Sequence, residues 1–490
     1  MTEHFEASQF SYSTQALPNN VLLDTLIRPN GDTDDLDKAT NVVWKYQPEK
    51  AIPHIVVGNT ISAGGQWVDN PVQASWDIGT LSYAGMLSLP GYSFAEHYRR
   101  TIGKELPPYT RPSRRQVTEY FRSYPHRVLI DDAIHCGETV SGISRTGDGF
   151  HVRSHGISCK HLVLASGVFS ELIPARPLLQ PLLHLPGPSA QPSSPDIPLL
   201  VVGSGFSAAD VITPCPPDQK ILHIYKWAPS TSPSPLRACH HQAYPEYAGV
   251  YRRMKQAARS GPAIDAIRRG SSRPKIGRAA TSAFDLSRDW DSKYEGLPNT
   301  IITDVKVEGE TALVTLQTPN GSTLQRRISR LEHVVGRRGS LRYLCRDLRR
   351  EVLPNSDSNG DSDSDSTVEM LSGQTLRDKV LEDIEVAPNV FAIGSLTGDS
   401  LVMFAYGSCT YAAGKIMASN LERSPVQQQQ QQMNGIAQPE DSTASQEHAH
   451  VGKIDAAPRM IMNGLDGHNG VGAEQDSRKL NEQPLDRRKT

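Results

Sequence analysis

The strongest constraint on the fold is the stretch LLVVGSGFSAAD at residues 199–210, near the middle of the chain. A continuous apolar run leads into Gly203, Gly205 and Ala208, which form the pattern G-x-G-x-x-A before a helix-prone segment. In a strand–turn–helix unit the first glycine allows a tight turn, and the second lets backbone N–H groups approach a pyrophosphate. A small third residue lets the helix pack on the strand. The stretch therefore predicts a dinucleotide-binding unit, whose helix Pro214 limits to a few turns.

The next apolar run, at residues 221–227, bears on which dinucleotide is bound. It ends in Tyr225-Lys226-Trp227, at the point where sites that prefer NAD carry an acidic residue for the ribose hydroxyls. A cation at Lys226 suits a 2′-phosphate, so the sequence favours NADPH over NADH. A solvated lysine at a strand end is the alternative, and the sequence leaves it open.

Other short apolar runs have the composition of buried strands. They cover residues 52–58, 161–167 and 389–395, and each carries a glycine at or near its end. Buried strands that end in glycine and meet helix-prone residues are typical of parallel βα units. Helices are predicted at residues 114–124 and 402–421, and the fold class is α/β with parallel sheets.

The charge balance and the cysteines exclude several classes of function. The 490 residues carry 51 Lys and Arg against 53 Asp and Glu, so we expect no field that attracts nucleic acid or an anionic membrane. Six scattered cysteines form no C-x-x-C pair, which argues against a dithiol relay and fits a reducing compartment. No secretory signal and no run approaching about 20 apolar residues is found, so we expect a soluble, cytoplasmic protein.

Two segments are too polar to fold. Residues 354–369 are acidic, and residues 424–490 contain a glutamine run followed by polar sequence. Neither has enough apolar side chains to offset the entropy of ordering. We predict a disordered insertion and a disordered tail.

Some reactive side chains attract attention without forming a motif. The run CHH at residues 239–241 is an unpromising metal cluster, because adjacent side chains diverge and no second ligand pair lies at helix or hairpin spacing. Arg111, Arg114 and Arg115 could meet a cofactor phosphate, and a solvated helix start explains them equally well. No Ser/His/Asp order or carboxylate pair stands out, so no catalytic residue and no metal site is predicted.

The chain as a whole resembles the oxidative-stress-induced growth inhibitor family, relatives of the NADPH-dependent flavin monooxygenases. The resemblance covers roughly residues 20–420, without the acidic insertion. The matching stretches are LLDTLIRP, WKYQPEKAIPHIVVG, AGGQW, SLPGYSFAEHY, VLASGVF, LLVVGSGFSAAD, AYPEY and LTGDSLVMFAYG.

This resemblance implies a two-dinucleotide-binding-domain flavoprotein with Rossmann-like parallel sheets. Its FAD domain would be discontinuous, at residues 1–175 and 385–423, and its NADPH domain would be inserted at residues 196–345. That insertion explains why the glycine motif lies mid-chain. The contacts implied for NADPH are Gly203, Gly205, Ser207 and Ala208, and those implied for FAD are Gly64, Gly65, Trp67, Gly394 and Asp399.

The sequence departs from the family at its start. The family opens with a strand and a G-x-G-x-x-G motif for FAD, and here no such motif precedes Gly58, so the first βα unit is expected to be missing. Gly58 also stands where flavin monooxygenases generally carry the glutamate that binds the adenosine ribose. An incomplete start, weak FAD binding and a loss of catalysis are three explanations.

The implied function is an FAD- and NADPH-dependent oxidoreductase of the flavin monooxygenase type, acting with oxygen on a small molecule. Amine N-hydroxylation competes with sulfur or ketone oxidation, and neither the substrate nor the oligomeric state is predicted. The alternative is a non-catalytic regulator of growth or stress that keeps the flavoprotein fold.

Overall fold

The computed structural model describes residues 16–29, 40–70, 72, 75–185, 195–268, 284, 287–353 and 370–434, without the side chains of residues 260–268 and 421–434. The chain divides into two compact units, Met1–Val426 and Gln427–Thr490, and all contacts given below lie within the first unit. The predicted acidic insertion and the part of the predicted tail beyond residue 434 lie outside the described residues.

The glycine-motif strand lies inside a four-stranded sheet. This strand, β8 (Leu199–Val202), pairs with β9 (Ile221–Tyr225) on one side and with β14 (Arg330–His333) on the other, while β10 (Tyr294–Pro298) pairs with β9. All three pairings are parallel. Because parallel strands end at the same edge of a sheet, the segments that follow β8 and β9 lie at one edge.

The side chains of β8 alternate between two buried cores. Leu199 and Val201 join a cluster with residues of α7 (Phe206–Ile212) and α8 (Pro245–Arg268), whereas Leu200 joins a cluster on the opposite face. Successive side chains of a strand point to opposite faces, and a parallel sheet is buried on both. This explains why LLVV is apolar throughout.

An antiparallel meander supplies the second of these cores. Strands β11 (Ile301–Glu308), β12 (Thr311–Gln317) and β13 (Thr323–Ile328) pair in sequence order. Alternate residues of β12 are fully buried in the core that contains Leu200, namely Ala312, Val314 and Leu316. Two short helices add to the two cores, α6 (Gln180–Leu183) to the meander side and α10 (Trp290–Lys293) to the α7–α8 side.

The residues before and after this sheet form several smaller sheets. Two pairings are parallel, β1 (Val56–Gly58) with β2 (Ile134–Cys136), and β6 (Leu162–Leu164) with β17 (Val390–Ala392). The β6–β17 pair joins segments from opposite sides of the β8 sheet in sequence. The strands with antiparallel pairings are β3 (Ile143–Thr146), β4 (Gly149–Val152), β5 (Ile157–Cys159), β7 (Glu171–Leu172), β15 (Arg337–Arg338) and β16 (Glu385–Ala387).

Three helices between β1 and β2 surround an aromatic cluster. They are α3 (Ala84–Leu87), α4 (Phe94–Ile102) and α5 (Arg114–Arg127). A capping box starts α5, because the Ser113 hydroxyl accepts from the Gln116 backbone N–H and the Gln116 side chain accepts from the Ser113 N–H. The buried aromatic residues of the cluster are Tyr92, Phe94, Tyr120 and Phe121.

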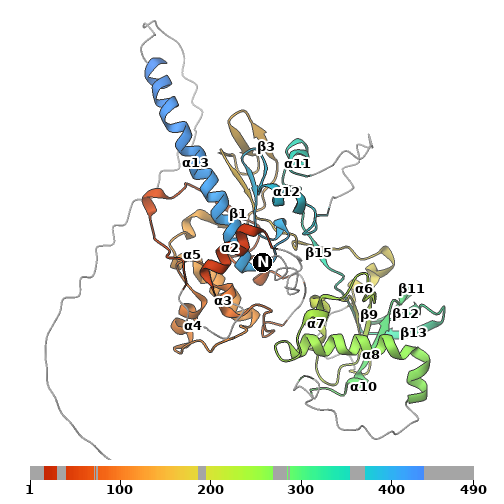
Figure 1. Ribbon diagram of the computed structural model, residues 1–490. Coiled ribbons are helices and arrows are strands. Elements are labelled where there is room, and N and C mark those ends of the chain that lie inside the picture. Colours follow the sequence, from red (N-terminus) through yellow and green to blue (C-terminus); the bar gives the residue numbers. More distant parts are fainter. Residues whose placement is uncertain are drawn as a thin grey trace, which may run out of the picture. The chain divides into compact units, whose positions relative to one another are not determined.

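The first and last described helices pack against each other. Figure 1 shows α2 (Pro18–Ile27, red) beside the N-terminal part of α13 (Val402–Asn434, blue). A Cβ on Gly407 would lie 2.4 Å from the Asn19 carbonyl oxygen, so the helices approach this closely only at a glycine. Helix α13 continues past residue 424, where the tail was predicted to begin.

The remaining helices are short. Helices α11 (Arg346–Val352) and α12 (Arg377–Glu382) bury Leu348, Val352 and Val380 in the core that contains β6 and β17. The 3₁₀ helices are η1 (Pro48–Lys50), η2 (Gly65–Trp67), η3 (Asp131–Ala133), η4 (Pro177–Leu179), η5 (Pro235–Ala238) and η6 (Gly394–Thr397).

The predicted elements are confirmed. Each apolar run holds a strand, β1, β6, β8, β9 or β17, and the predicted helices at 114–124 and 402–421 are α5 and α13. Helix α7 ends at Ile212, two residues before Pro214. The fold class, α/β with parallel strands, is confirmed by the pairings. Within the described part of the chain, no helix is both long and apolar enough to cross a membrane.

Candidate nucleotide-binding sites

The turn between β8 and α7 requires its first glycine. Gly203 has φ +155°, and a Cβ there would lie 2.4 Å from the Val334 carbonyl oxygen at the end of β14. Its N–H donates to the Ile224 carbonyl of β9 at 3.0 Å, so the residue is fixed against both neighbouring strands. Gly205 is the N-cap of α7. The first glycine is therefore required by the tight turn itself, as the motif predicts.

Helix α7 is held firmly behind this turn. Ala208 is fully buried in the α7–α8 core, as a small third residue of the motif predicts, while Ser207 is half-buried. One turn further on, the Tyr247 hydroxyl of α8 donates to the Asp210 carboxylate at 2.9 Å. Burial raises the pKa of Asp210 to about 6, although the Tyr247 hydrogen bond lowers it. The side of α7 that faces α8 is therefore anchored.

A histidine within β9 also contacts the turn. His223 is fully buried, its Nε2 lies 2.6 Å from the Gly203 carbonyl oxygen, and its Nδ1 lies 2.8 Å from the Tyr294 hydroxyl. Burial lowers the pKa of His223 to about 4, although the bond to the Gly203 carbonyl opposes that shift. The imidazole is therefore neutral at neutral pH.

Lys226 lies at the same sheet edge as the glycine turn. It directly follows β9, which pairs in parallel with β8 through Val202 and Ile224, and its side chain is exposed. The neighbouring backbone is fixed, because Asn299 accepts from the Trp227 N–H at 2.7 Å and donates to the Trp227 carbonyl at 3.0 Å. An exposed cation on a fixed strand end can reach a phosphate bound at this edge.

The residues predicted for FAD form two separate segments. Gly64, Gly65 and Trp67 belong to the turn after β1, where both glycines have left-handed φ angles of +118° and +52°. A Cβ on Gly64 would lie 2.8 Å from the Val68 side chain, whereas Gly65 has open space beside it. Trp67 and Val402 pack against the same aromatic cluster. This cluster brings the first segment near the start of α13.

The second segment contains Gly394 and Asp399, which differ in whether a ligand could reach them. Gly394 has φ +63° and open space beside it. The side chain of Asp399 is 1% exposed, and its carboxylate accepts from the Leu17 N–H at 2.8 Å, the Asn20 side-chain amide at 2.6 Å and Arg377 Nη1 at 3.1 Å. Any ligand contact with this carboxylate requires the N-terminal end of α2 to move.

Asn20 completes this buried network. Its side-chain oxygen accepts from the Ser408 N–H at 2.6 Å and from the Ser408 hydroxyl at 2.8 Å. One amide thus joins the Asp399 carboxylate to α13, and we call Asn20, Arg377, Asp399 and Ser408 the α2 clasp. Gly65 and Gly394 leave open space that a ligand could approach, whereas Asp399 does not face a free surface in this arrangement.

Arg111, which precedes α5, and Arg114, its first residue, have structural partners. Arg111 Nη2 lies 2.6 Å from the Glu246 carboxylate, and Nη1 donates to the Ala243 carbonyl at 2.7 Å. Arg114 is buried, and its Nε donates to the Trp67 carbonyl at 3.2 Å. A solvated helix start is therefore wrong for both. The AYPEY segment, which contains Ala243 and Glu246, is bonded to this loop.

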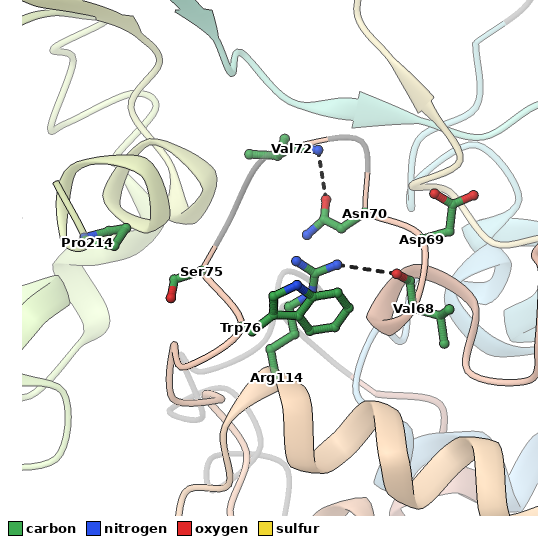
Figure 2. Close-up of a pocket in the computed structure, with 8 residues that line it drawn as sticks. All are labelled: Val68, Asp69, Asn70, Val72, Ser75, Trp76, Arg114 and Pro214. Carbon is green, nitrogen blue, oxygen red and sulfur yellow. Dashed lines mark hydrogen bonds between the residues drawn. The ribbon is translucent and has the colours of Figure 1, made fainter. Parts of the chain in front are cut away.

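A cavity of about 480 Å³ adjoins Arg114. In Figure 2 the indole of Trp76 lies over the guanidinium of Arg114, at 4.1 Å from the ring centroid. Arg114 also donates to the Val68 carbonyl at 3.5 Å. None of the predicted cofactor residues lines the cavity, whose walls are Val68, Asp69, Asn70, Val72, Ser75, Trp76, Arg114 and Pro214.

Sequence reasoning missed several residues that shape these sites. His223, Arg377 and Asn20 belong to no motif and act through contacts with residues far away in sequence. A histidine inside the otherwise apolar run ILHIY is the one available signal, because a buried imidazole needs partners. Over the described residues, no group of three His, Cys, Asp or Glu side chains is arranged to hold a metal ion.

These features define the class of protein. A parallel sheet with a dinucleotide-type glycine turn is inserted between two segments that pair with each other at β6–β17. The chain is an α/β protein in which this parallel sheet interrupts a second region that also contains parallel strand pairs.

The chain is similar to a curated protein over most of its length. Oxidative stress-induced growth inhibitor 1 of Mus musculus is 22% identical over 446 residues, which cover 83% of this chain and 83% of that protein. The resemblance predicted from the motifs is thus confirmed. No family model matches the chain.

Two solved structures are also similar. Bacillithiol disulfide reductase from Bacillus cereus has a TM-score of 0.44 and 13% identity, over 76% of this chain and 93% of that one. A flavin-containing monooxygenase from Stenotrophomonas maltophilia has a TM-score of 0.42 and 16% identity, over 75% of this chain and 91% of that one.

The neutral state of His223 predicts a pH dependence of stability. The unfolded chain takes up a proton below pH 6.5, and the folded chain only near pH 4, so acidification favours unfolding. The difference between these pKa values corresponds to about 3 kcal/mol. His223→Gln keeps a donor and an acceptor without titrating. Urea unfolding at a series of pH values from about pH 7 to about pH 4.5 should therefore show a smaller loss of unfolding free energy for the variant than for the wild type. The same loss in both proteins would contradict a buried, neutral His223.

The α2 clasp predicts a large effect of one arginine. Arg377→Met leaves the buried Asp399 carboxylate without its cation and should lower the free energy of unfolding by about 3 kcal/mol. Arg100→Met is the matched control, because it breaks an exposed pair with Glu96 and should cost less than about 0.5 kcal/mol. Urea unfolding measures the free energy of unfolding of both variants. Equal, small losses in the two variants would show that the α2 clasp contributes nothing to stability.

Proposed function

We propose that this chain is an FAD- and NADPH-dependent oxidoreductase, of the flavin monooxygenase type, that acts with oxygen on a small molecule in the cytoplasm. The observation that carries the proposal is the β8–α7 turn, where Gly203 is fixed between two strands and could not carry a side chain. Similarity to the Mus musculus relative over most of both chains supports the family resemblance from which the two cofactors are inferred.

On the NADPH side, each residue has a distinct role. The backbone at Gly205 and Ser207 would bind the pyrophosphate, helped by the partial positive charge at the start of α7. Gly203, whose N–H is bonded to the Ile224 carbonyl, would shape the turn around it. Ala208 keeps α7 close to the sheet, and exposed Lys226 would pair with the 2′-phosphate. The role of the chain is to bind and orient the dinucleotide.

On the FAD side, backbone groups would do most of the binding. Gly65 and Gly394 have left-handed conformations and open space, which suits close approach of a nucleotide, and Gly64 and Trp67 would line the same site. Bound FAD would supply hydride acceptance and oxygen activation. Domains at residues 1–175 with 385–423 for FAD, and at 196–345 for NADPH, follow from this proposal.

A second candidate is a non-catalytic regulator of growth or stress that keeps the fold. The α2 clasp favours it, because the carboxylate predicted to meet FAD is bonded within the chain instead. The two candidates differ in whether flavin is bound and reduced.

The visible absorption spectrum tests the proposal. The purified full chain, incubated with FAD and separated from free flavin, should show bound-flavin bands that bleach on addition of NADPH and recover in air. Persistent absence of bound flavin would reject the enzyme and leave the regulator.

A matched pair of variants links reduction of the flavin to the β8–α7 turn. Gly203→Ala should bind FAD but slow bleaching by at least about tenfold, because its Cβ meets the Val334 carbonyl. Gly414→Ala, in α13 with open space beside it, should leave bleaching unchanged.

Lys226 should decide the preference for the 2′-phosphate. Lys226→Ala should weaken the binding of 2′,5′-ADP about tenfold, as expected for the loss of one charge-assisted hydrogen bond. It should leave the affinity for 5′-ADP unchanged. Lys306→Ala, an exposed lysine of the meander, is the control. Equal affinities in calorimetry for wild type and Lys226→Ala would identify Lys226 as a solvated strand-end residue.

A further inference from the structure

Two side chains from outside the glycine motif hold successive carbonyl groups of the β8–α7 turn. His223 Nε2 lies 2.6 Å from the Gly203 carbonyl oxygen, and the Ser234 hydroxyl donates to the Ser204 carbonyl oxygen at 2.5 Å. His223 comes from β9, and Ser234 from the loop that follows this strand. The turn is thus held by contacts that the G-x-G-x-x-A pattern does not contain.

The hydrogen positions in the first contact follow from the partners. A carbonyl oxygen can only accept, so His223 Nε2 carries the hydrogen and donates it to Gly203. Nδ1 of the same neutral ring must then accept, and the Tyr294 hydroxyl at 2.8 Å donates to it. Burial raises the pKa of Tyr294 well above its ordinary value, which keeps that hydroxyl protonated. A chain of two hydrogen bonds therefore runs from Tyr294 through His223 to the turn.

Anchoring these carbonyls also aims the N–H groups of the turn. In a trans peptide the C=O and the following N–H point in opposite directions, and none of the described peptides is cis. The Gly203 carbonyl faces His223, so the Ser204 N–H points away from β9. The Ser204 carbonyl faces Ser234, so the Gly205 N–H points away from that loop. Among the described residues, no acceptor is recorded for either N–H.

We propose that His223 and Ser234 are positioning residues that set the Ser204 and Gly205 N–H groups for the pyrophosphate of a bound dinucleotide. This inference rests on the proposed function, because it assigns NADPH to this turn. Donors fixed during folding lose little conformational freedom when the ligand binds, which raises affinity without new contacts. The two residues act through the backbone and do not touch the ligand.

Ser234 allows a cleaner test than buried His223. It is half-buried, caps η5 by accepting from the Leu236 N–H at 3.3 Å, and belongs to no hydrophobic core. Its removal should therefore disturb the turn without unfolding the sheet. Ser232, which is exposed in the same loop, provides a matched serine-to-alanine control.

The experiment measures binding of NADP⁺ to the full chain by calorimetry. Ser234→Ala should raise the Kd about fivefold, the effect of one hydrogen bond, with the same melting temperature as Ser232→Ala. Ser234→Thr keeps the hydroxyl and should return the Kd to within about twofold of wild type. In the core, His223→Gln should bind NADP⁺ more tightly than His223→Leu, because only glutamine can donate to Gly203 and accept from Tyr294.

A second readout separates positioning from general stability. Amide hydrogen exchange of the 203–208 segment, without nucleotide, should be faster in Ser234→Ala and unchanged in Ser232→Ala. If the wild-type chain binds NADP⁺ and Ser234→Ala binds it with the same Kd, the positioning role is overturned while the assignment of NADPH to this turn stands. Failure of the wild-type chain to bind NADP⁺ would overturn the assignment of NADPH to this turn, and the positioning role with it.

Discussion

The parallel pairing of β8 with β9 and β14 is the constraint on which the candidate site depends. It places the ends of three strands at one edge, where the Gly203 N–H is bonded to β9 and its Cα lies against the Val334 carbonyl after β14. A side chain at Gly203 would separate these strands. The same pairing buries His223 beneath the turn, so the order of the strands also determines the geometry of the turn.

Buried polar groups tie the remaining elements to this frame. Asp399, Arg377 and Asn20 satisfy one another where α2 meets α13, and Arg111 with Glu246 joins the α5 loop to α8. The first three side chains are removed from water and the last two largely so, and a buried polar group must find its partner within the chain. Because these partners lie on different elements, the polar contacts fix the positions of the helices more strictly than apolar contacts alone would.

Local patterns predicted the strands and the glycine turn, because each depends on residues adjacent in sequence. The run LLVV is apolar since both faces of β8 are covered, and Pro214 stops α7 for local steric reasons. The partners of Arg114 and Asp399 were not predictable. Trp76 and Asn20 lie far from them in the sequence, and no spacing rule encodes such contacts.

The sequence by itself determined the α/β class, the strand positions and the glycine turn, because periodicity and glycine sterics act over a few residues. The tertiary structure decided which side chains are exposed and which contact each other. It turned Asp399 inward against α2, buried Arg114 under Trp76, and set His223 and Ser234 on the carbonyls of the turn. Those outcomes depend on hydrogen bonds between residues that only folding brings within about 3 Å.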